Sequence, residues 1–180
     1  IGRLVGSEMC IRDSANPSST LGIAHTRWAT HGEPSEKNAH PHKSNERIYI
    51  VHNGIIENHL ELKSFLVNQG YQFISETDSE VIGHLLEYFL SQGSNILDAI
   101  YLTKEKLDGA YAIAILDIED DENIYIARSK APLLIGKGDK ENFAASDPLA
   151  VGKLANEFIF LEAVTYTHLL AHETTDNLVC

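Results

Sequence analysis

The segment RIYIVHNGIIENH, residues 47–59, does most to decide how this chain folds. Its first part, from Arg47 to His52, is rich in β-branched and aromatic residues and predicts a strand. The strand leads into Asn53-Gly54, which can place a side-chain amide and an exposed backbone N–H on one side of the chain. Two such donors about 3 Å from a developing negative oxygen would form an oxyanion hole. A plain hairpin turn is the alternative, because Asn-Gly is the commonest type I′ pair.

On both sides of this segment, between residues 18 and 162, strand and helix patterns alternate. We predict strands at 21–29, 47–52, 71–74, 110–118, 123–127, 133–135, 143–145 and 158–161, and helices at 57–69, at 95–107 and after residue 77. Hairpin-like strands that follow adjacent helices indicate an antiparallel sheet with helices packed on it. The pattern therefore predicts an α+β fold or a layered α/β fold.

Two of the predicted helices have recognisable ends and buried faces. The helix over 57–69 should end at Gly70, and its inward residues are expected to be Leu60, Phe65 and Leu66. The next helix follows Thr77, which together with Glu80 matches a capping box. Its apolar stripe is typical of a buried helix face and consists of Val81, Ile82, Leu85, Leu86 and Phe89.

The composition is that of an acidic globular chain. The 180 residues include 14 Lys and Arg against 26 Asp and Glu, a net charge of −12, and such a surface repels nucleic-acid phosphates. A hydrophobic fraction of 43% with a mean hydropathy of −0.15 excludes wholesale disorder. The longest apolar run, 110–116, is far shorter than a membrane span. Cys10 and Cys180 form no disulfide framework. We expect a cytoplasmic protein whose partners are neither nucleic acid nor membrane.

Two charged residues could each bind a charged group of a ligand. Arg27 lies within an apolar strand run, where a guanidinium is costly unless it meets an anion, and its planar group suits a carboxylate. Asp78 lies in the first turn of a predicted helix and could accept from an ammonium group. A structural ion pair for Arg27 and a favourable helix-terminus charge for Asp78 are the alternatives.

The remaining polar clusters match no metal or phosphate motif. The histidines that invite a zinc interpretation are His25, His31, His40 and His42. Neither an H-E-x-x-H motif nor paired cysteines accompany them, so we predict no metal and no cofactor. The turn at 136–138 is too short for a phosphate loop. The aromatic residues expected in the core at strand spacing are Tyr111, Tyr125 and Phe143.

Several long motifs follow one another in an order that resembles one enzyme family. They are GIAHTRWATHGEPSEKNAHPH (22–42), VHNGIIENH (51–59), SETDSEVIGHLL (75–86), ENFAASDPLA (141–150) and FIFLE (158–162). Together they resemble the glutaminase domain of glutamine–fructose-6-phosphate aminotransferases, which is a class II glutamine amidotransferase domain. The context of Trp28 and His31 favours this family over the related amidophosphoribosyltransferase and asparagine synthetase domains.

The resemblance implies an α+β fold of the N-terminal-nucleophile hydrolase type, a four-layer αββα sandwich of antiparallel sheets. It also implies roles in binding L-glutamine. Arg27 would hold the α-carboxylate of glutamine, and Asp78 would receive its α-ammonium. The residues that would line the glutamine pocket are Trp28, Thr30, His31 and Gly54. Asn53 and the Gly54 N–H would form the oxyanion hole, and His40 would support the site.

The reaction implied by the resemblance is amide hydrolysis by an N-terminal cysteine, whose own α-amine can serve as the base. In the complete enzyme, which is expected to be a homodimer, the ammonia aminates fructose 6-phosphate in a C-terminal sugar-isomerising domain. This sequence departs from the family's Met-Cys-Gly-Ile start, because Ile11-Arg12-Asp13 follows Cys10. We therefore leave the nucleophile unidentified, since Cys10 lacks that context, and predict that the chain as given is inactive.

The resemblance divides the chain into three parts. Residues 18–162 correspond to a partial glutamine amidotransferase domain whose fold is incomplete at the N-terminus. Residues 1–17 and 163–180 lie outside the resemblance and are expected to be foreign or disordered flanks. Two alternatives for the function stay open. One is a non-catalytic glutamine-binding module, and the other is the glutaminase half of another amidotransferase, such as amidophosphoribosyltransferase.

Overall fold

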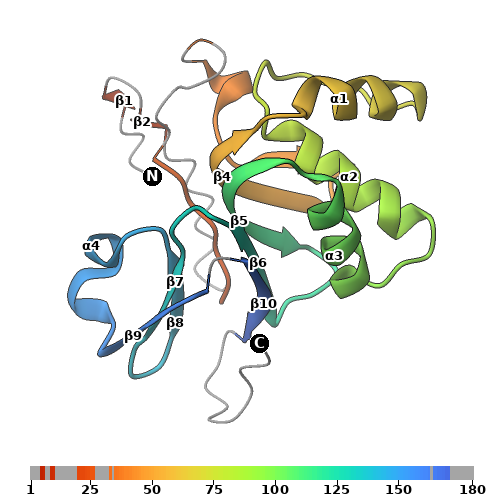
Figure 1. Ribbon diagram of the computed structural model, residues 1–180. Helices are drawn as coiled ribbons and strands as arrows, with labels where there is room; N and C mark the ends of the chain where they lie inside the picture. Colours follow the sequence, from red (N-terminus) through yellow and green to blue (C-terminus); the bar gives the residue numbers. More distant parts are fainter. Residues whose placement is uncertain are drawn as a thin grey trace.

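Figure 1 shows the computed structural model of the protein, which describes residues 5–6, 9–10, 20–26, 33, 35–162 and 164–170. Its centre is a five-stranded antiparallel sheet with the strand order β10-β6-β5-β4-β3. The strands are β3 (His42–Ser44), β4 (Ile48–Ile56), β5 (Gly109–Asp117), β6 (Asn123–Ser129) and β10 (Val164–Leu170). Along its whole length β4 pairs with β5, from Ile48 opposite Asp117 to Ile56 opposite Gly109.

Helices α1 (His59–Asn68), α2 (Glu80–Ser91) and α3 (Ile96–Lys106) lie on one side of this sheet (Figure 1). The apolar stripe predicted for α2 is confirmed, because Phe89 is half-buried and the other four members are buried, namely Val81, Ile82, Leu85 and Leu86. The stripe packs against Ile48 and Ile50 of β4 in the main core. Asn95 caps α3 by accepting a hydrogen bond from the Asp98 N–H at 2.9 Å.

A smaller sheet of order β8-β7-β9 packs on the other face, beside the short helix α4 (Pro148–Val151) (Figure 1). Its strands are β7 (Leu134–Lys137), β8 (Asn142–Ala145) and β9 (Glu157–Phe160). Alternate residues of β5 explain the layering, because Ile113 belongs to the core under the helices and Ala112 to a second core with Leu133 and Ile135. The predicted stack of antiparallel sheets and helices is therefore confirmed.

Asn53 and Gly54 lie inside β4, so the hairpin-turn alternative is wrong. The strand continues to Ile56 because Gly54 adopts a φ of +123° and stays in register opposite Tyr111. A Cβ at this position would lie 2.0 Å from the carbonyl oxygen of Ala110 on β5. Glycine is thus required by close approach of two strands rather than by a turn.

Two local predictions near α1 and α2 are wrong, in part or in full. Of the residues predicted to point inward from α1, Leu66 is buried, whereas Leu60 and Phe65 are 69% and 39% exposed and Leu62 is buried in their place. Residues 71–74 form no strand, and the N–H of Ile74 is donated to a side chain of α2. The helix does end before Gly70, whose φ is +95°.

The C-terminal part of the described chain also differs from expectation. Residues 164–170, where the strand pattern was expected to be lost, form β10 and pair with all of β6. In the N-terminal part, β1 (Val5–Gly6) and β2 (Met9–Cys10) are two-residue strands that pair with each other. The strand predicted over 21–29 is absent from its described part, 21–26. A short 3₁₀ turn, η1 (Glu36–Asn38), precedes β3.

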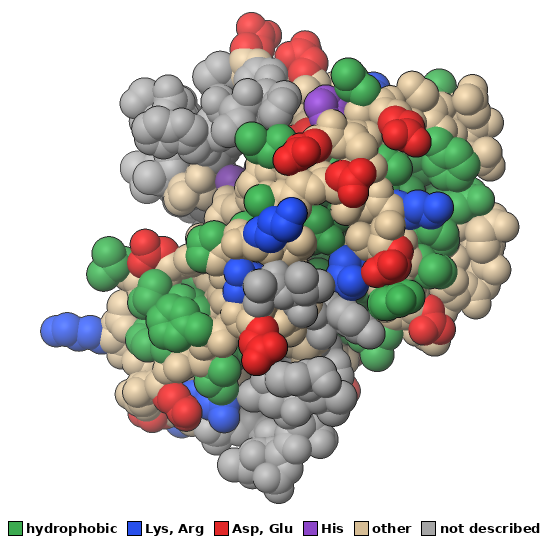
Figure 2. Space-filling view, viewed as in Figure 1, with side chains coloured by type: hydrophobic (Ala, Val, Ile, Leu, Met, Phe, Trp, Pro, Cys, Tyr) green, Lys and Arg blue, Asp and Glu red, His purple; other side chains and the backbone are tan. Residues whose placement is uncertain are grey.

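The surface fits the acidic composition. Figure 2 shows acidic and hydrophobic side chains distributed over both the helical half and the small-sheet lobe. Exposed apolar residues of that lobe are Leu149, Leu154 and Phe160. The predicted core aromatics Tyr111 and Tyr125 are buried, whereas Phe143 is half-buried. No helix in the described part of the chain is long and apolar enough to cross a membrane.

Candidate active site

A cavity of about 290 Å³ lies between the two sheets and exposes the middle of β4. Its polar wall includes His25, His52 and Asn53. Much of the remaining wall is alanine, contributed by Ala24, Ala112, Ala114, Ala144, Ala145 and Ala150. Small side chains on both sheets keep the space open, so a compact polar ligand could reach the Asn53 amide.

The side chain of Asn53 is held in one orientation by His25. The His25 Nε2 lies 2.6 Å from the Asn53 Oδ1. An amide oxygen accepts and cannot donate, so the proton of this hydrogen bond is on His25 Nε2. The bond occupies the oxygen end of the amide and leaves its NH₂ end as a hydrogen-bond donor. This is the polarity that an oxyanion hole needs.

Asp78 lies two residues before the start of α2 and is only 3% exposed. Its Oδ2 accepts a hydrogen bond from the N–H of Ile56 at 2.8 Å, two residues beyond Gly54. The neighbouring Ser79 Oγ lies 2.9 Å from Nδ1 of His52, one residue before Asn53. Residues 78 and 79 therefore bind β4 on both sides of the Asn53-Gly54 pair.

His40 joins these groups through ring contacts. Its ring is 5% exposed and lies against the His25 ring, with 4.2 Å between centroids, and against the His42 ring at 4.7 Å. The Nε2 of His42 in turn lies 3.0 Å from the Thr77 Oγ1. The predicted supporting residue thus lies between the strand that bears Asn53 and the segment that bears Asp78.

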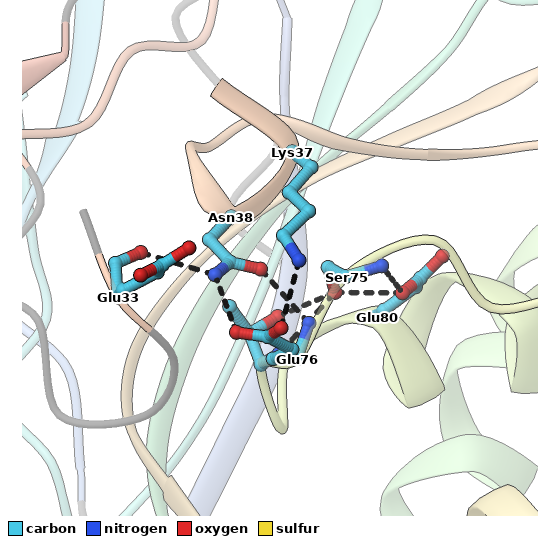
Figure 3. Close-up of polar contacts among 7 residues, drawn as sticks. Glu33, Lys37, Asn38, Ser75, Glu76 and Glu80 are labelled. Atoms are coloured by element: carbon cyan, nitrogen blue, oxygen red, sulfur yellow. Dashed lines mark hydrogen bonds and ion pairs between the residues drawn. The ribbon is translucent and has the colours of Figure 1, made fainter. Parts of the chain in front are cut away.

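The segment before α2 is held by side chains rather than by a sheet (Figure 3). Asn38 is fully buried, and its Oδ1 accepts from the Glu76 N–H at 2.8 Å. The Lys37 Nζ lies 2.7 Å from Glu76, and this hydrogen bond lowers the pKa of the Glu76 carboxyl. These contacts connect the segment to η1, which precedes β3.

The capping box predicted for α2 is wrong. Ser79, and not Thr77, is the N-cap, and it makes no side-chain cap hydrogen bond. Glu80 reaches further back and accepts from the backbone N–H groups of Ile74 and Ser75. Burial would raise the pKa of Glu80, but the neighbouring His84 imidazole and the hydrogen bonds from Ile74 and Ser75 outweigh it and lower the pKa to about 2.

The structure thus brings together Asn53, Gly54, Asp78 and His40 of the predicted site residues. The others fall outside the residues that it describes, namely Arg27, Trp28, Thr30 and His31. Cys10 is described only through the pairing of β2 with β1. Within the described residues no three His, Cys, Asp or Glu side chains are arranged to hold a metal ion.

The roles of two residues of the site were not predicted from the sequence. His25 was seen only as one of several histidines, and its contact with Asn53 spans 28 positions of the chain. Glu80 was assigned to a capping box, because the spacing to Thr77 fits that motif. The signal for Glu80 was the run of hydroxyl and acidic residues at 75–80, which indicates a hydrogen-bonded segment without specifying partners.

A family model of the glutamine amidotransferase domain matches residues 25–152 of this chain, which include every site residue described above. The chain belongs to the glutamine amidotransferase domain family. The match confirms the glutamine amidotransferase resemblance inferred from the five motifs between residues 22 and 162.

Curated relatives named glutamine–fructose-6-phosphate aminotransferase (isomerizing) are similar to this amidotransferase domain over most of its length. The protein from Photorhabdus laumondii is 52% identical over 163 residues, which cover 89% of this chain and 27% of that protein. The protein from Salmonella typhi is 56% identical over 141 residues, which cover 78% of this chain and 23% of that protein. The chain therefore spans about a quarter of the length of the curated relatives it matches.

Two solved structures share the fold of this amidotransferase domain. A glutamine phosphoribosylpyrophosphate amidotransferase from B. subtilis, in complex with ADP and GMP, gives a TM-score of 0.62 at 25% identity. A structure described as the allosteric regulatory enzyme of purine biosynthesis gives a TM-score of 0.63 at 26% identity. Each match covers 84% of this chain and 35% of the other chain. These neighbours confirm the N-terminal-nucleophile hydrolase fold.

Proposed function

We propose that this amidotransferase domain binds L-glutamine beside Asn53 and serves a reaction that releases ammonia from the glutamine side chain. The observation that carries the proposal is the Asn53 amide in the wall of the cavity, with its oxygen held by His25 and its NH₂ end left to donate. A tetrahedral intermediate of amide hydrolysis bears an oxyanion, and a fixed donor of this kind stabilises it.

The Asp78 carboxylate beside β4 and the role that the family resemblance implies for Arg27 support a zwitterionic amino acid as the ligand. Asp78 would receive the α-ammonium group, and Arg27 would bind the α-carboxylate. One anionic and one cationic residue fix the amino-acid end, so that the amide carbon comes to lie near Asn53 and Gly54. L-glutamate would be rejected because a second carboxylate would face the alanines of the cavity wall, and no Lys or Arg is among the described residues that line it.

The nucleophile is the part of the reaction that this chain leaves unassigned. The sequence contains two cysteines, Cys10 and Cys180, and neither stands in the family's N-terminal context. The chain as given should therefore bind glutamine without hydrolysing it. Release of ammonia that disappears in a Cys10→Ala variant would overturn this expectation and make Cys10 the nucleophile.

The acceptor of the ammonia is proposed to be fructose 6-phosphate, which is converted to glucosamine 6-phosphate. The support is the 52% and 56% identity to proteins named for this reaction, against 25% and 26% to the solved phosphoribosylpyrophosphate amidotransferase and purine-biosynthesis enzymes. Fructose 6-phosphate would bind a sugar-isomerising domain outside this chain. We further propose a cytoplasmic enzyme, in keeping with the two isolated cysteines, and a homodimer, as the family resemblance implies.

Isothermal titration calorimetry with L-glutamine tests the proposed function. We expect saturable binding of L-glutamine to the full chain and none of L-glutamate at the same concentrations. An ammonia assay on the same sample should give no signal above the buffer. Equal heats for the two amino acids would contradict the site as described, because the cavity would then not distinguish an amide from a carboxylate.

A further inference from the structure

Glu80 is the centre of a buried hydrogen-bond network that includes the residues immediately before Asp78 in the chain. The side chain is 2% exposed, and both of its oxygens accept hydrogen bonds. Oε1 accepts from the Ile74 N–H at 3.0 Å, and Oε2 accepts from the Ser75 N–H at 2.8 Å and the Ser75 hydroxyl at 2.6 Å. Three donors from two consecutive residues therefore converge on one carboxylate.

These donors belong to a stretch that lacks any regular backbone ladder. Residues 71–78 form neither helix nor strand, and the N–H groups of residues 74–77 all donate to side chains. Helix α2 has no side-chain cap hydrogen bond at Ser79, in contrast to α3, which Asn95 caps. The Glu80 carboxylate is thus used to hold the preceding residues rather than to cap its own helix.

The network continues from Glu80 toward the site. The Ser75 Oγ lies 3.0 Å from the Thr77 Oγ1, which lies 3.0 Å from Nε2 of His42 on β3. Asp78 follows immediately and accepts from the N–H of Ile56 on β4. Any displacement of Ser75 would therefore move Asp78 relative to the end of β4.

Glu80 itself is held from the opposite side by His84, one helical turn further along α2. The His84 Nε2 lies 3.5 Å from the Glu80 Oε1, and its Nδ1 lies 2.8 Å from the Ser44 Oγ on β3. The rings of Tyr71 and Phe73 pack against the His84 ring, with centroids 5.1 and 4.6 Å away. The carboxylate is therefore fixed relative to β3 before any ligand arrives.

We propose that Glu80 is the positioning residue of Asp78: by binding the backbone and hydroxyl of Ser75, it holds Asp78 against Ile56 at the end of β4. The consequence for glutamine, that Asp78 is preset to receive the α-ammonium, rests on the proposed function. A carboxylate that stays ionised through the neutral range suits this task, and the lowered pKa of Glu80 agrees with it.

The Ile56 amide proton reports the position of Asp78 directly, because it donates to the Asp78 carboxylate. We would measure amide hydrogen exchange by NMR on the full chain and compare E80Q with E61Q. Glu61 is the matched control, since it is also acidic and in the first turn of a helix, but it is exposed. In E80Q we expect protection of the Ile56 amide to fall about tenfold more than that of Ile50 and Ile113 in the sheet.

A second variant keeps the test decisive if E80Q does not fold. S75A removes the hydroxyl bond to Glu80 and the link to Thr77 but keeps the backbone donor, so a smaller loss confined to Ile56 is expected. An Ile56 amide as protected in both variants as in E61Q would overturn the proposal, as would equal loss throughout the sheet.

The glutamine titration separates this inference from the function on which it rests. If the wild-type chain binds no glutamine while E80Q still lowers the exchange protection of the Ile56 amide, the proposed function fails and the positioning of Asp78 by Glu80 stands. If glutamine binds and E80Q leaves the exchange protection of the Ile56 amide unchanged, the function stands and the positioning role is refuted. The two failures are thus distinguishable in the same samples.

Discussion

The two halves of the candidate site are built in opposite ways. Asn53 and Gly54 lie within β4, which is paired with β5 over its whole length, so the position of this half follows from the backbone ladder. Asp78 lies at the end of an irregular segment that side chains hold, chiefly those of Glu80, Asn38 and Thr77. The first half should therefore be disrupted by substitutions that alter backbone geometry, and the second by substitutions that remove a single polar group.

Gly54→Ala should have the largest effect. The added Cβ would lie 2.0 Å from the Ala110 carbonyl oxygen, so β4 and β5 would have to separate, and we expect a loss of at least about 4 kcal/mol in the free energy of unfolding. Gly93→Ala is the matched control, because Gly93 has a φ of +93° but nothing within 4 Å of the added carbon. It should lose only about 1 to 2 kcal/mol. Urea unfolding measures both, and equal losses would contradict the strand argument.

The second half should show its dependence on one carboxylate through pH. The pKa of Glu80 is lowered from 4.5 to about 2 in the folded protein, so its contribution is complete at neutral pH and is lost as the pH falls from about 5 to about 2. The expected contribution is about 3 kcal/mol. Urea unfolding from pH 7 to pH 2.5 should show a shallower loss of stability in E80Q than in the wild type and E61Q. Parallel pH profiles for all three would refute the assignment.

Asp78→Asn should affect binding more than folding. The asparagine oxygen can still accept from the Ile56 N–H, so the contact with β4 is kept while the negative charge is removed. Loss of a charged partner for the ammonium group is expected to weaken glutamine binding by roughly 2 kcal/mol, or about thirtyfold in Kd. Asp98→Asn, at an exposed position in α3, should leave Kd unchanged. Calorimetry that gives both variants the same Kd would remove Asp78 from the site.

The smallest effect is expected for His25→Leu, which removes the donor that orients the Asn53 amide. One hydrogen bond of this kind contributes about 1 kcal/mol, so glutamine Kd should rise about fivefold at most. The NMR signals of the Asn53 side-chain NH₂ group should broaden or shift as the amide gains freedom. His25→Gln keeps an N–H donor and should restore much of the wild-type spectrum, whereas an unchanged spectrum in His25→Leu would show that His25 does not orient Asn53.

The same contrast explains what the sequence could predict. The stripe of α2 was predicted because helical period leaves a local pattern, Asn53-Gly54 was singled out by its two donors after a strand, and five motifs in order indicated the family. The hairpin alternative at Asn53-Gly54 failed because the choice between a turn and a close strand contact depends on Ala110, 56 positions away. No local pattern records such a contact.

The irregular half was predicted least well for the same reason. Thr77 and Glu80 fit the capping-box spacing, yet Thr77 contacts His42 and Glu80 accepts from Ser75. The Ser75 N–H needs a side-chain acceptor because no neighbouring strand supplies a backbone carbonyl. The inward placement of Leu60 was wrong because the elements packed against α1 decide which of its faces is buried. They bury Leu62 together with Leu66. Residues 164–170 joined the sheet through pairing with β6, which their own Thr- and His-rich sequence did not indicate.

An NMR titration of the full chain with L-glutamine tests most directly whether the two halves form one site. The account predicts that the Asn53 side-chain NH₂ signals and the Ile56 backbone amide signal shift together and give a single Kd. Signals of α3, far along the chain from both groups, should stay unchanged. A response in only one of the two halves, or in neither, would contradict the claim that β4 and the Asp78 segment bind the same glutamine molecule.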